Sequence, residues 1–441
     1  MVKAAQLILS LSILVILHEF GHYIFARVFK TRVEKFYLFF DPWFSLFKVK
    51  KGETEYGIGW LPLGGYVKIS GMIDESMDKE ALKLPPKSWE FRSKPAWQRL
   101  LIMLGGVLMN FIFAFIIYIG VLYAWGEEYL PTENVKYGIV VNEVGEEIGF
   151  QTGDKILTVD DKYVENFMKI IPTIVLDDAQ NVKVERNGEI VDVEICDDDL
   201  ALMLKSRSVI GPRIPFALGV DSFTDNSPAQ AAGLKPGDEI KGMNGETFKF
   251  YDQWTEAAKM NAGETVTLNI ERDGEPMDIK LQIAENGLIG VKNSHFAEQH
   301  FELRTIRYGF FQSIPAGIER GVQTTRDYLK QFKLFFKPDT RAYESLGGFA
   351  TIGSIFPGTW DWFSFWNMTA FISIILAIMN LLPIPALDGG HVMFLFFEMV
   401  TGRKPGEKFL EYAQIAGMVI LLALVIFANA NDIIKMINGT L

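Results

Sequence analysis

Two histidines and a glutamate near the start of the chain have the spacing of a zinc-binding motif. Residues His18-Glu19-Phe20-Gly21-His22 form an H-E-x-x-H sequence. On a helix, positions i and i+4 lie on one face, so both imidazoles can bind one zinc ion while Glu19 stays close enough to act as a base. A catalytic zinc site needs three protein ligands and an open position, so another ligand must come from elsewhere in the chain.

Asp388 is the candidate that we favour for the third ligand. It is the only acid between Asp361 and Glu398, and it lies in the apolar sequence Asn380-Leu381-Leu382-Pro383-Ile384-Pro385-Ala386-Leu387-Asp388-Gly389-Gly390-His391. The prolines before it and the glycines after it predict a broken helix, and broken helices at membrane depth line protein or a cavity. The structural alternative is that Asp388 only caps the helix that restarts after it.

The remaining acids and histidines are weaker candidates. Asp41 lies 19 residues beyond His22, but Asp41-Pro42-Trp43 is typical of a turn, so it is the next candidate rather than the first. His391 follows Asp388 closely and is the third histidine that can belong to the site. His295 and His300 lie in a polar linker, and we interpret them as surface histidines.

The elements that position these residues are long apolar segments. Four stretches lack Lys, Arg, Asp and Glu: Ala4–Leu17, Leu100–Gly126, Trp362–Leu387 and Tyr412–Asn431. About 20 apolar residues span a bilayer, and the first stretch reaches that length when it continues through the histidine motif. No signal-peptide cleavage pattern follows Leu17, so we expect a retained helix. Four membrane spans exclude a simple soluble enzyme.

Composition excludes two further classes of protein. The net charge is −11 and no basic low-complexity tract is present, which argues against nucleic-acid binding. A single cysteine, Cys196, excludes an internal disulfide framework and a thiolate zinc site.

The charges also predict an orientation. Residues 27–99 carry 14 Lys or Arg against 9 Asp or Glu, a net charge of +5, whereas residues 126–300 carry 16 against 33, a net charge of −17. Basic short loops stay in the cytoplasm. We therefore expect the first loop inside, the acidic segment outside and both termini outside.

The acidic segment contains a repeat. The sequence Gly149-Phe150-Gln151-Thr152-Gly153-Asp154-Lys155-Ile156-Leu157 recurs 84 residues later as Gly233-Leu234-Lys235-Pro236-Gly237-Asp238-Glu239-Ile240-Lys241, and alternating strands follow both copies. This pattern resembles the Gly-Leu-x-x-Gly-Asp turn of PDZ domains, which bind an extended peptide at a sheet edge. It predicts two β-rich PDZ-like domains, although Phe150 replaces the usual Leu.

Two other segments have distinctive patterns. Residues 56–69 are apolar, rich in glycine and too short to span a membrane, which predicts a β-hairpin that re-enters the membrane beside the site. A small cytoplasmic hairpin is the alternative. Residues 301–341 interleave basic and aromatic side chains, which is typical of an amphipathic helix on a membrane surface, or of a helix that packs on the PDZ-like units.

The two polar motifs together resemble the site-2 protease family of intramembrane zinc metalloproteases. The order of four spans, the sequence Leu63-Gly64-Gly65-Tyr66-Val67-Lys68 and the two outward PDZ-like units are similar to the RseP type of bacteria in particular. Before the third span, Gly347-Gly348-Phe349-Ala350 replaces the Gly-Pro that the family often has.

The resemblance implies one Zn²⁺ per chain, bound by His18, His22 and Asp388, with Glu19 as the catalytic acid and base. It implies that Asn380 contacts the substrate, and we expect Gly64, Gly65 and Tyr66 to do so as well. The implied partners are the lipid bilayer and single-span membrane proteins, such as an anti-sigma factor already shortened by another protease or a signal peptide remnant. The implied location is the bacterial inner membrane.

The expected architecture is a multi-span α-helical membrane protein with four transmembrane helices, two outer PDZ-like domains and a re-entrant hairpin on the cytoplasmic side. The expected segments are residues 1–27 (first span), 28–98 (cytoplasmic-side segment), 99–126 (second span), 127–208 and 209–295 (PDZ-like domains), 296–360 (membrane-surface segment), 361–400 (third span) and 411–434 (fourth span).

Two other functions compete with proteolysis. A metal transporter would use an intramembrane His and Asp cluster, but it gives Glu19 no role and leaves the PDZ-like domains unexplained. A non-catalytic PDZ scaffold does not account for a complete set of zinc ligands. For the PDZ-like domains, a filter that excludes substrates with bulky outer domains is favoured over recruitment of peptide ends.

Overall fold

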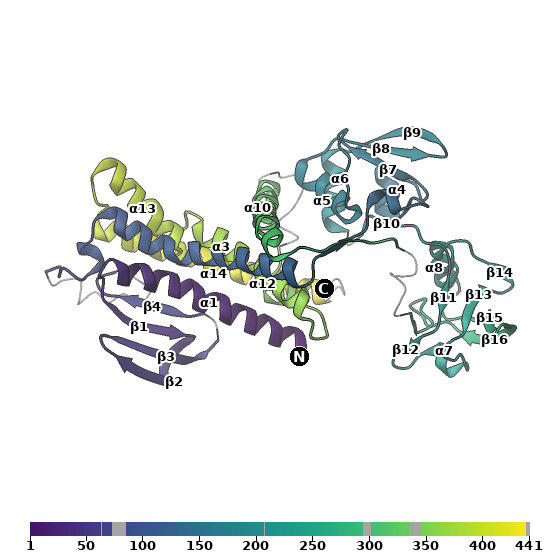
Figure 1. The fold of residues 1–441 in the computed structure, drawn as a ribbon, viewed down its shortest axis with the longest axis horizontal. Helices are drawn as coiled ribbons and strands as arrows, with labels where there is room; N and C mark the ends of the chain where they lie inside the picture. Colours follow the sequence, from purple (N-terminus) through teal and green to yellow (C-terminus); the bar gives the residue numbers. More distant parts are fainter. Residues whose placement is uncertain are drawn as a thin grey trace. The chain divides into compact units, whose positions relative to one another are not determined.

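The computed structural model describes residues 1–62, 64–72, 85–206, 208–293, 301–335, 337 and 346–437. The chain divides into two compact units (Figure 1). Unit 1 comprises residues 1–126, 307–329 and 346–441, and unit 2 comprises residues 127–306 and 330–345. Leu63, His295 and His300, which the sequence singled out, lie outside the described residues.

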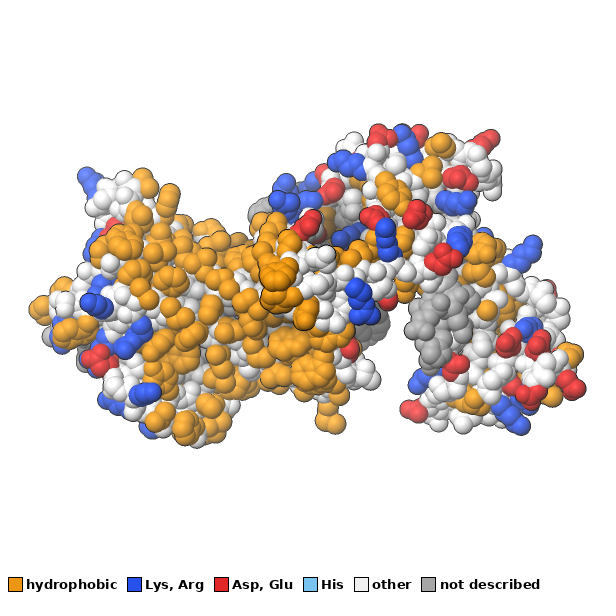
Figure 2. Space-filling view, in the orientation of Figure 1, with side chains coloured by type: hydrophobic (Ala, Val, Ile, Leu, Met, Phe, Trp, Pro, Cys, Tyr) orange, Lys and Arg blue, Asp and Glu red, His pale blue; other side chains and the backbone are white. Residues whose placement is uncertain are grey.

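Unit 1 is built on four helices that are long and apolar enough to cross a membrane. They are α1 (Val2–Val28), α3 (Ala96–Ala124), α12 (Trp362–Leu381) and α14 (Glu407–Ile437). Helix α3 packs against both α1 and α12. Hydrophobic side chains cover most of the visible face of these helices (Figure 2). An apolar outer surface of this kind is what a bilayer stabilises.

The third apolar segment is not one continuous helix. Helix α12 ends at Leu381, and α13 (Asp388–Thr401) begins only after Pro383 and Pro385, with Ala386 at a φ of 89°. A Cβ on Gly389 would lie 2.1 Å from the carbonyl oxygen of Leu382. The proline turn and the tight glycine contact therefore place Asp388 at the first residue of a new helix.

A small sheet follows α1 in unit 1. Its strands are β1 (Val33–Leu38), β2 (Phe40–Lys51), β3 (Thr54–Leu61) and β4 (Tyr66–Ile69), in the order β2-β3-β1-β4. The predicted hairpin over residues 56–69 is therefore wrong, because β3 and β4 do not pair with each other. Strand β1 lies between them, parallel to β3 and antiparallel to β4. As a result β3 is internal and β4 is an edge strand.

Two further helices and a turn complete the described parts of the chain outside the β-rich region. They are a short turn η1 (Phe91–Ser93), α10 (Phe310–Phe335) and α11 (Phe349–Ser354). Helix α10 begins in unit 1, where Arg320 Nη2 donates to Asn367 Oδ1 of α12 at 3.0 Å. A Cβ on Gly321 would lie 2.1 Å from the Phe115 ring of α3. The amphipathic segment thus packs closely on the apolar helices.

Unit 2 contains two β-rich cores. The elements around the first core are β5 (Glu127–Tyr129), η2 (Thr132–Asn134), β6 (Ile139–Val141), α4 (Glu143–Ile148), β7 (Lys155–Val159), η3 (Phe167–Lys169), α5 (Ile170–Asp177), β8 (Asn181–Arg186), β9 (Glu189–Glu194), α6 (Asp197–Lys205), β10 (Ile210–Pro212) and β18 (Arg304–Ile306). Those of the second are β11 (Leu218–Gly219), β12 (Ser222–Phe223), α7 (Pro228–Ala231), β13 (Glu239–Met243), β14 (Glu246–Thr247), α8 (Tyr251–Met260), β15 (Thr265–Arg272), β16 (Glu275–Gln282) and β17 (Val291–Lys292).

The two copies of the repeat are built alike at the aspartate turn. Arg272 Nε and Nη2 donate to the two carboxylate oxygens of Asp238, each at 2.7 Å, and Arg186 bridges Asp154 in the same way at 2.8 and 2.7 Å. Each aspartate side chain is only 1% exposed. The turn aspartates are therefore structural in both copies, and the PDZ assignment stays a prediction.

We expect the Asp238→Asn substitution to destabilise the second core at neutral pH. The hydrogen bonds from Arg272 hold the pKa of Asp238 below its usual value. The ionised carboxylate therefore stabilises the folded state at pH values above the aspartate pKa of the unfolded chain, about 3.9. This stabilisation is lost as the pH falls through the lower pKa of the folded state. Urea unfolding of residues 127–306 can be followed by the fluorescence of Trp254. At neutral pH the free energy of unfolding should be lower for the variant than for the wild type, and this difference should disappear below about pH 4. A difference of equal size at pH 7 and pH 3 would contradict this account.

Candidate metal centre and active site

Three ligand atoms from two helices meet inside unit 1. His18 and His22 lie one turn apart on α1, and Asp388 begins α13. The Nε2 atoms of His18 and His22 are 3.2 Å apart, and Asp388 Oδ2 lies 3.1 and 3.3 Å from them. The three atoms form a nearly equilateral triangle, the arrangement that the H-E-x-x-H sequence and Asp388 predicted.

The dimensions of this triangle suit zinc. Metal–ligand distances near 2.0–2.1 Å in a tetrahedral site separate neighbouring ligand atoms by about 3.3 Å. The Asp388 Oδ2 atom is buried, and it accepts no hydrogen bond of normal geometry from the described residues. A buried carboxylate oxygen without a donor is costly, and a cation held beside two imidazole nitrogens would compensate it. The residues present therefore fit a zinc ion with one open side.

Helix α3 supports the two histidines from behind. The carbonyl oxygen of Ile102 lies 2.8 Å from His22 Nδ1, and the side-chain nitrogen of Asn110 lies 3.3 Å from His18 Nδ1. Between these two residues, a Cβ on Gly106 would lie 2.5 Å from His22 Nε2. The close approach of the helices depends on a glycine contact as well, because a Cβ on Gly21 would lie 2.1 Å from the Gly105 carbonyl oxygen.

Sequence reasoning did not identify these contributions from α3. Asn110 carries a signal that could have been used, since it is a polar residue within an uncharged membrane-length stretch and is fully buried. The role of the Ile102 carbonyl carries no signal, because every residue has the same backbone acceptor. Gly106 is one of several glycines in α3, and only the structure shows which one faces the histidines.

A cavity of about 810 Å³ opens beside the ligand atoms. The predicted site residues that line it are His18, Glu19, His22, Gly64, Gly65, Tyr66, Asn380 and Asp388. Gly65 allows the loop before β4 to pack on α1, because a Cβ there would lie 2.9 Å from Val15 and 3.6 Å from the Glu19 side chain. The structure thus brings the residues of both polar motifs and of the glycine loop to one cavity.

Asp41 and His391 also line this cavity, but they do not belong to the group of three ligand atoms. Asp41 accepts hydrogen bonds from Tyr66 Oη at 2.9 Å and Ser45 Oγ at 3.0 Å. Among the described residues, the group of ligand atoms close enough to share a metal comprises His18, His22 and Asp388 without Asp41 or His391. Asp41 instead holds the Tyr66 hydroxyl on the neighbouring strand.

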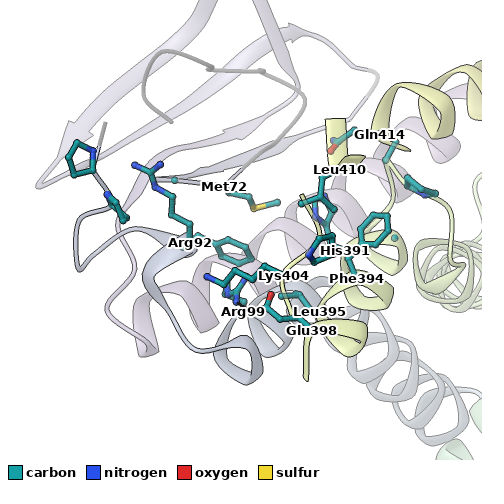
Figure 3. A pocket seen from close by; sticks show the side chains of 18 residues that line it. Met72, Arg92, Arg99, His391, Phe394, Leu395, Glu398, Lys404, Leu410 and Gln414 are labelled. Carbon is teal, nitrogen blue, oxygen red and sulfur yellow. Dashed lines mark hydrogen bonds and ion pairs between the residues drawn. The ribbon is translucent and has the colours of Figure 1, made fainter. Parts of the chain in front are cut away.

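A second cavity, of about 580 Å³, adjoins the first (Figure 3). The two share Met72, Ala386, His391 and Gln414 in their linings. In the second cavity Arg99 Nη2 and Glu398 Oε1 form an ion pair at 2.6 Å, and Arg92 also faces it. Charged side chains therefore line this second cavity, which reaches the neighbourhood of the ligand atoms through the four shared residues.

We expect the Gly106→Ala substitution to weaken metal binding about tenfold or more, because its methyl group would lie 2.5 Å from His22 Nε2 and 2.7 Å from His18 Nε2 and so displace the imidazoles. Gly120 on the same helix is the matched control, since a Cβ there meets nothing within 4 Å. Metal content after dialysis against a graded series of chelators should fall for Gly106→Ala and stay at the wild-type level for Gly120→Ala. Equal metal content in the two variants would show that the glycine does not shape the site.

The comparisons with known proteins agree with this geometry. Residues 6–424 match the model of peptidase family M50. The Regulator of sigma E protease of Haemophilus influenzae is 28% identical over 97% of this chain and 98% of its own length, and the Regulator of sigma-E protease RseP of Escherichia coli is 28% identical over 97% of each chain. A relative in Neisseria meningitidis, 29% identical over 98% of each chain, has a provisional name as a zinc metalloprotease. The chain is therefore a zinc-dependent metalloprotease of the membrane and belongs to peptidase family M50, the site-2 proteases.

Proposed function

We propose that this protein cleaves the transmembrane segments of single-span membrane proteins, and that His18, His22 and Asp388 hold the zinc ion. The triangle of ligand atoms, with sides of 3.1–3.3 Å, is the observation that supports this most strongly. It lies between helices long and apolar enough to cross a membrane. Polar and ionisable groups in such surroundings are costly, and their usual explanation is function.

Bound zinc would polarise the scissile carbonyl and lower the pKa of water. Glu19 is one residue beyond His18 and lines the same cavity, so its carboxylate can take the proton of the attacking water and pass it to the leaving nitrogen. Asn380 lines the cavity from α12. Its amide can donate a hydrogen bond either to the substrate backbone or to the oxygen on which negative charge develops.

The substrate segment must be extended where it is cut, because a helix hides its carbonyl groups in its own hydrogen bonds. Strand β4 suits this role, since it is an edge strand and all four of its residues line the cavity. An extended segment can pair with such an edge. Gly64, Gly65 and Tyr66 would contact the substrate at the beginning of this strand, while the internal strand β3 has no edge to offer.

The physiological substrate belongs to a class rather than to one protein. An anti-sigma factor shortened outside the membrane and a signal peptide remnant both present a short single-span helix without a bulky outer domain. The similarity to proteases named as regulators of sigma E supports the first of these. We also propose that unit 2, which forms a compact unit of its own, selects substrates by excluding those with bulky outer domains.

Two substitutions should separate metal binding from catalysis. Glu19→Gln should keep about one zinc per chain and reduce cleavage about 10²–10⁴-fold, because it removes the proton acceptor but no ligand. Asp388→Ala should lose zinc and activity together, because two ligands remain. Zinc content of the purified variants and cleavage of a candidate single-span substrate in cells are the two measurements.

The same pair of variants distinguishes the competing functions. A metal transporter would keep its flux in the Glu19→Gln variant, and a non-catalytic scaffold would hold no zinc in the wild type. Full zinc and full activity in Asp388→Ala would instead move the third ligand elsewhere, with Asp41 as the next candidate.

We also propose that the protein lies in the bacterial inner membrane with residues 126–360 on the outer side, as the net charges of +5 on residues 27–99 and −17 on residues 126–300 predict. Cys196 tests this orientation because it is the single cysteine and is exposed. A membrane-impermeant maleimide should label it in intact spheroplasts. Labelling only after the membrane is permeabilised would reverse the orientation, and a Cys196→Ser variant controls for unspecific reaction.

A further inference from the structure

The support that α3 gives to the two histidines follows one face of the helix. Ile102, Gly106 and Asn110 are spaced at i, i+4 and i+8, so they lie in a row. His22 lies opposite the first of them and His18 opposite the last. Each imidazole therefore presents Nε2 to the ligand triangle and Nδ1 to α3.

The partner of His22 fixes the position of its proton. A backbone carbonyl only accepts hydrogen bonds, so the contact of 2.8 Å with Ile102 requires a proton on Nδ1. The Nε2 atom of the neutral ring then has a free lone pair for a metal. A second partner of this kind orients metal-binding histidines in many proteins.

His18 has the same requirement but a different partner. If its Nε2 is to bind the metal, its Nδ1 must carry the proton and needs an acceptor. The neighbour at this atom is the Asn110 amide, with its nitrogen at 3.3 Å. The Asn110 Oδ1 atom is buried and has no hydrogen-bond partner among the described residues. Turning the amide by 180° brings this oxygen to Nδ1, where it accepts the hydrogen bond of the imidazole N–H, since the two ends of an amide have the same shape.

We propose that Asn110 is a positioning residue for the zinc site: its Oδ1 accepts a hydrogen bond from His18 Nδ1–H and so fixes the ring form that presents Nε2 to the metal. This inference depends on the proposed assignment of His18 as a ligand. The opposite arrangement, in which the amide nitrogen donates to Nδ1, would leave the proton of the neutral ring on Nε2. That proton would point into the ligand triangle and exclude a metal.

Three variants of the full-length protein in detergent test the proposal through zinc affinity rather than activity. Asn110→Leu removes the acceptor at similar volume and should weaken zinc binding about 10- to 100-fold. Asn110→Asp keeps an acceptor, removes every donor and makes the imidazole more basic, so it should bind zinc more tightly than the wild type. Thr369→Val is the matched control, because the hydrogen-bond partners of Thr369 Oγ1 among the described residues are Ser10 Oγ at 3.0 Å and the Phe365 carbonyl at 2.8 Å, not a histidine.

Zinc affinity would be measured by competition with a chromophoric chelator. Weak binding by Asn110→Leu, rescue by Asn110→Asp and an unchanged Thr369→Val variant would support the proposal. Equal affinities for Asn110→Leu and wild type would overturn it, as would equally weak binding by Asn110→Asp and Asn110→Leu. If Asn110→Leu does not fold, Asn110→Asp decides by itself: tighter binding than wild type supports the proposal, and unchanged or weaker binding overturns it.

A separate control distinguishes failure of this inference from failure of the ligand assignment. Wild-type protein should hold zinc, and His18→Ala should lose it. Wild-type protein without zinc, or full zinc in His18→Ala, would overturn the ligand assignment and with it the role of Asn110. Zinc-loaded wild type together with an unaffected Asn110→Leu variant would overturn the role of Asn110 alone.

Discussion

The structure of unit 1 depends on the requirement that three polar ligand atoms lie 3.1–3.3 Å apart among apolar helices. A carboxylate and two imidazoles in such surroundings are unfavourable unless charge and hydrogen bonds compensate them. The proline turn after α12 sets Asp388 at the start of α13, and the one-turn spacing on α1 sets the histidines. Each of these features is needed for the same small triangle.

Helix α3 makes the triangle possible although it contributes no ligand. It packs against both α1 and α12, and its glycines let the backbones of α1 and α3 approach closely. Small residues permit such approaches between membrane helices. The supporting row on α3 then gives each imidazole a neighbour on its far side. The cavity beside the triangle is also lined by Glu19, Asn380 and the glycine loop, so the residues proposed for proton transfer and substrate contact lie beside the proposed ligands.

The sequence allowed the apolar helices and the ligand triangle to be predicted, because charge-free stretches and the H-E-x-x-H spacing are local signals. Asp388 was identifiable as the single acid in a long apolar region. The strand pairing of residues 56–69 could not be predicted in the same way. Strands β3 and β4 resemble a hairpin in the sequence, but strand β1, which comes earlier in the chain, lies between them in the sheet. The part played by Ile102 was also hidden, because it uses a backbone atom that every residue has.

The backbone partner of His22 has a consequence for how this site tolerates sequence change. The hydrogen bond comes from the main chain, so another apolar side chain of similar volume at position 102 would leave it in place. Position 106 has no such freedom, since any Cβ there would lie within 2.7 Å of both imidazoles. Positions 102 and 106 lie on neighbouring turns of one membrane helix, yet they should tolerate very different numbers of substitutions. The more restricted of the two is the glycine, which has no side chain.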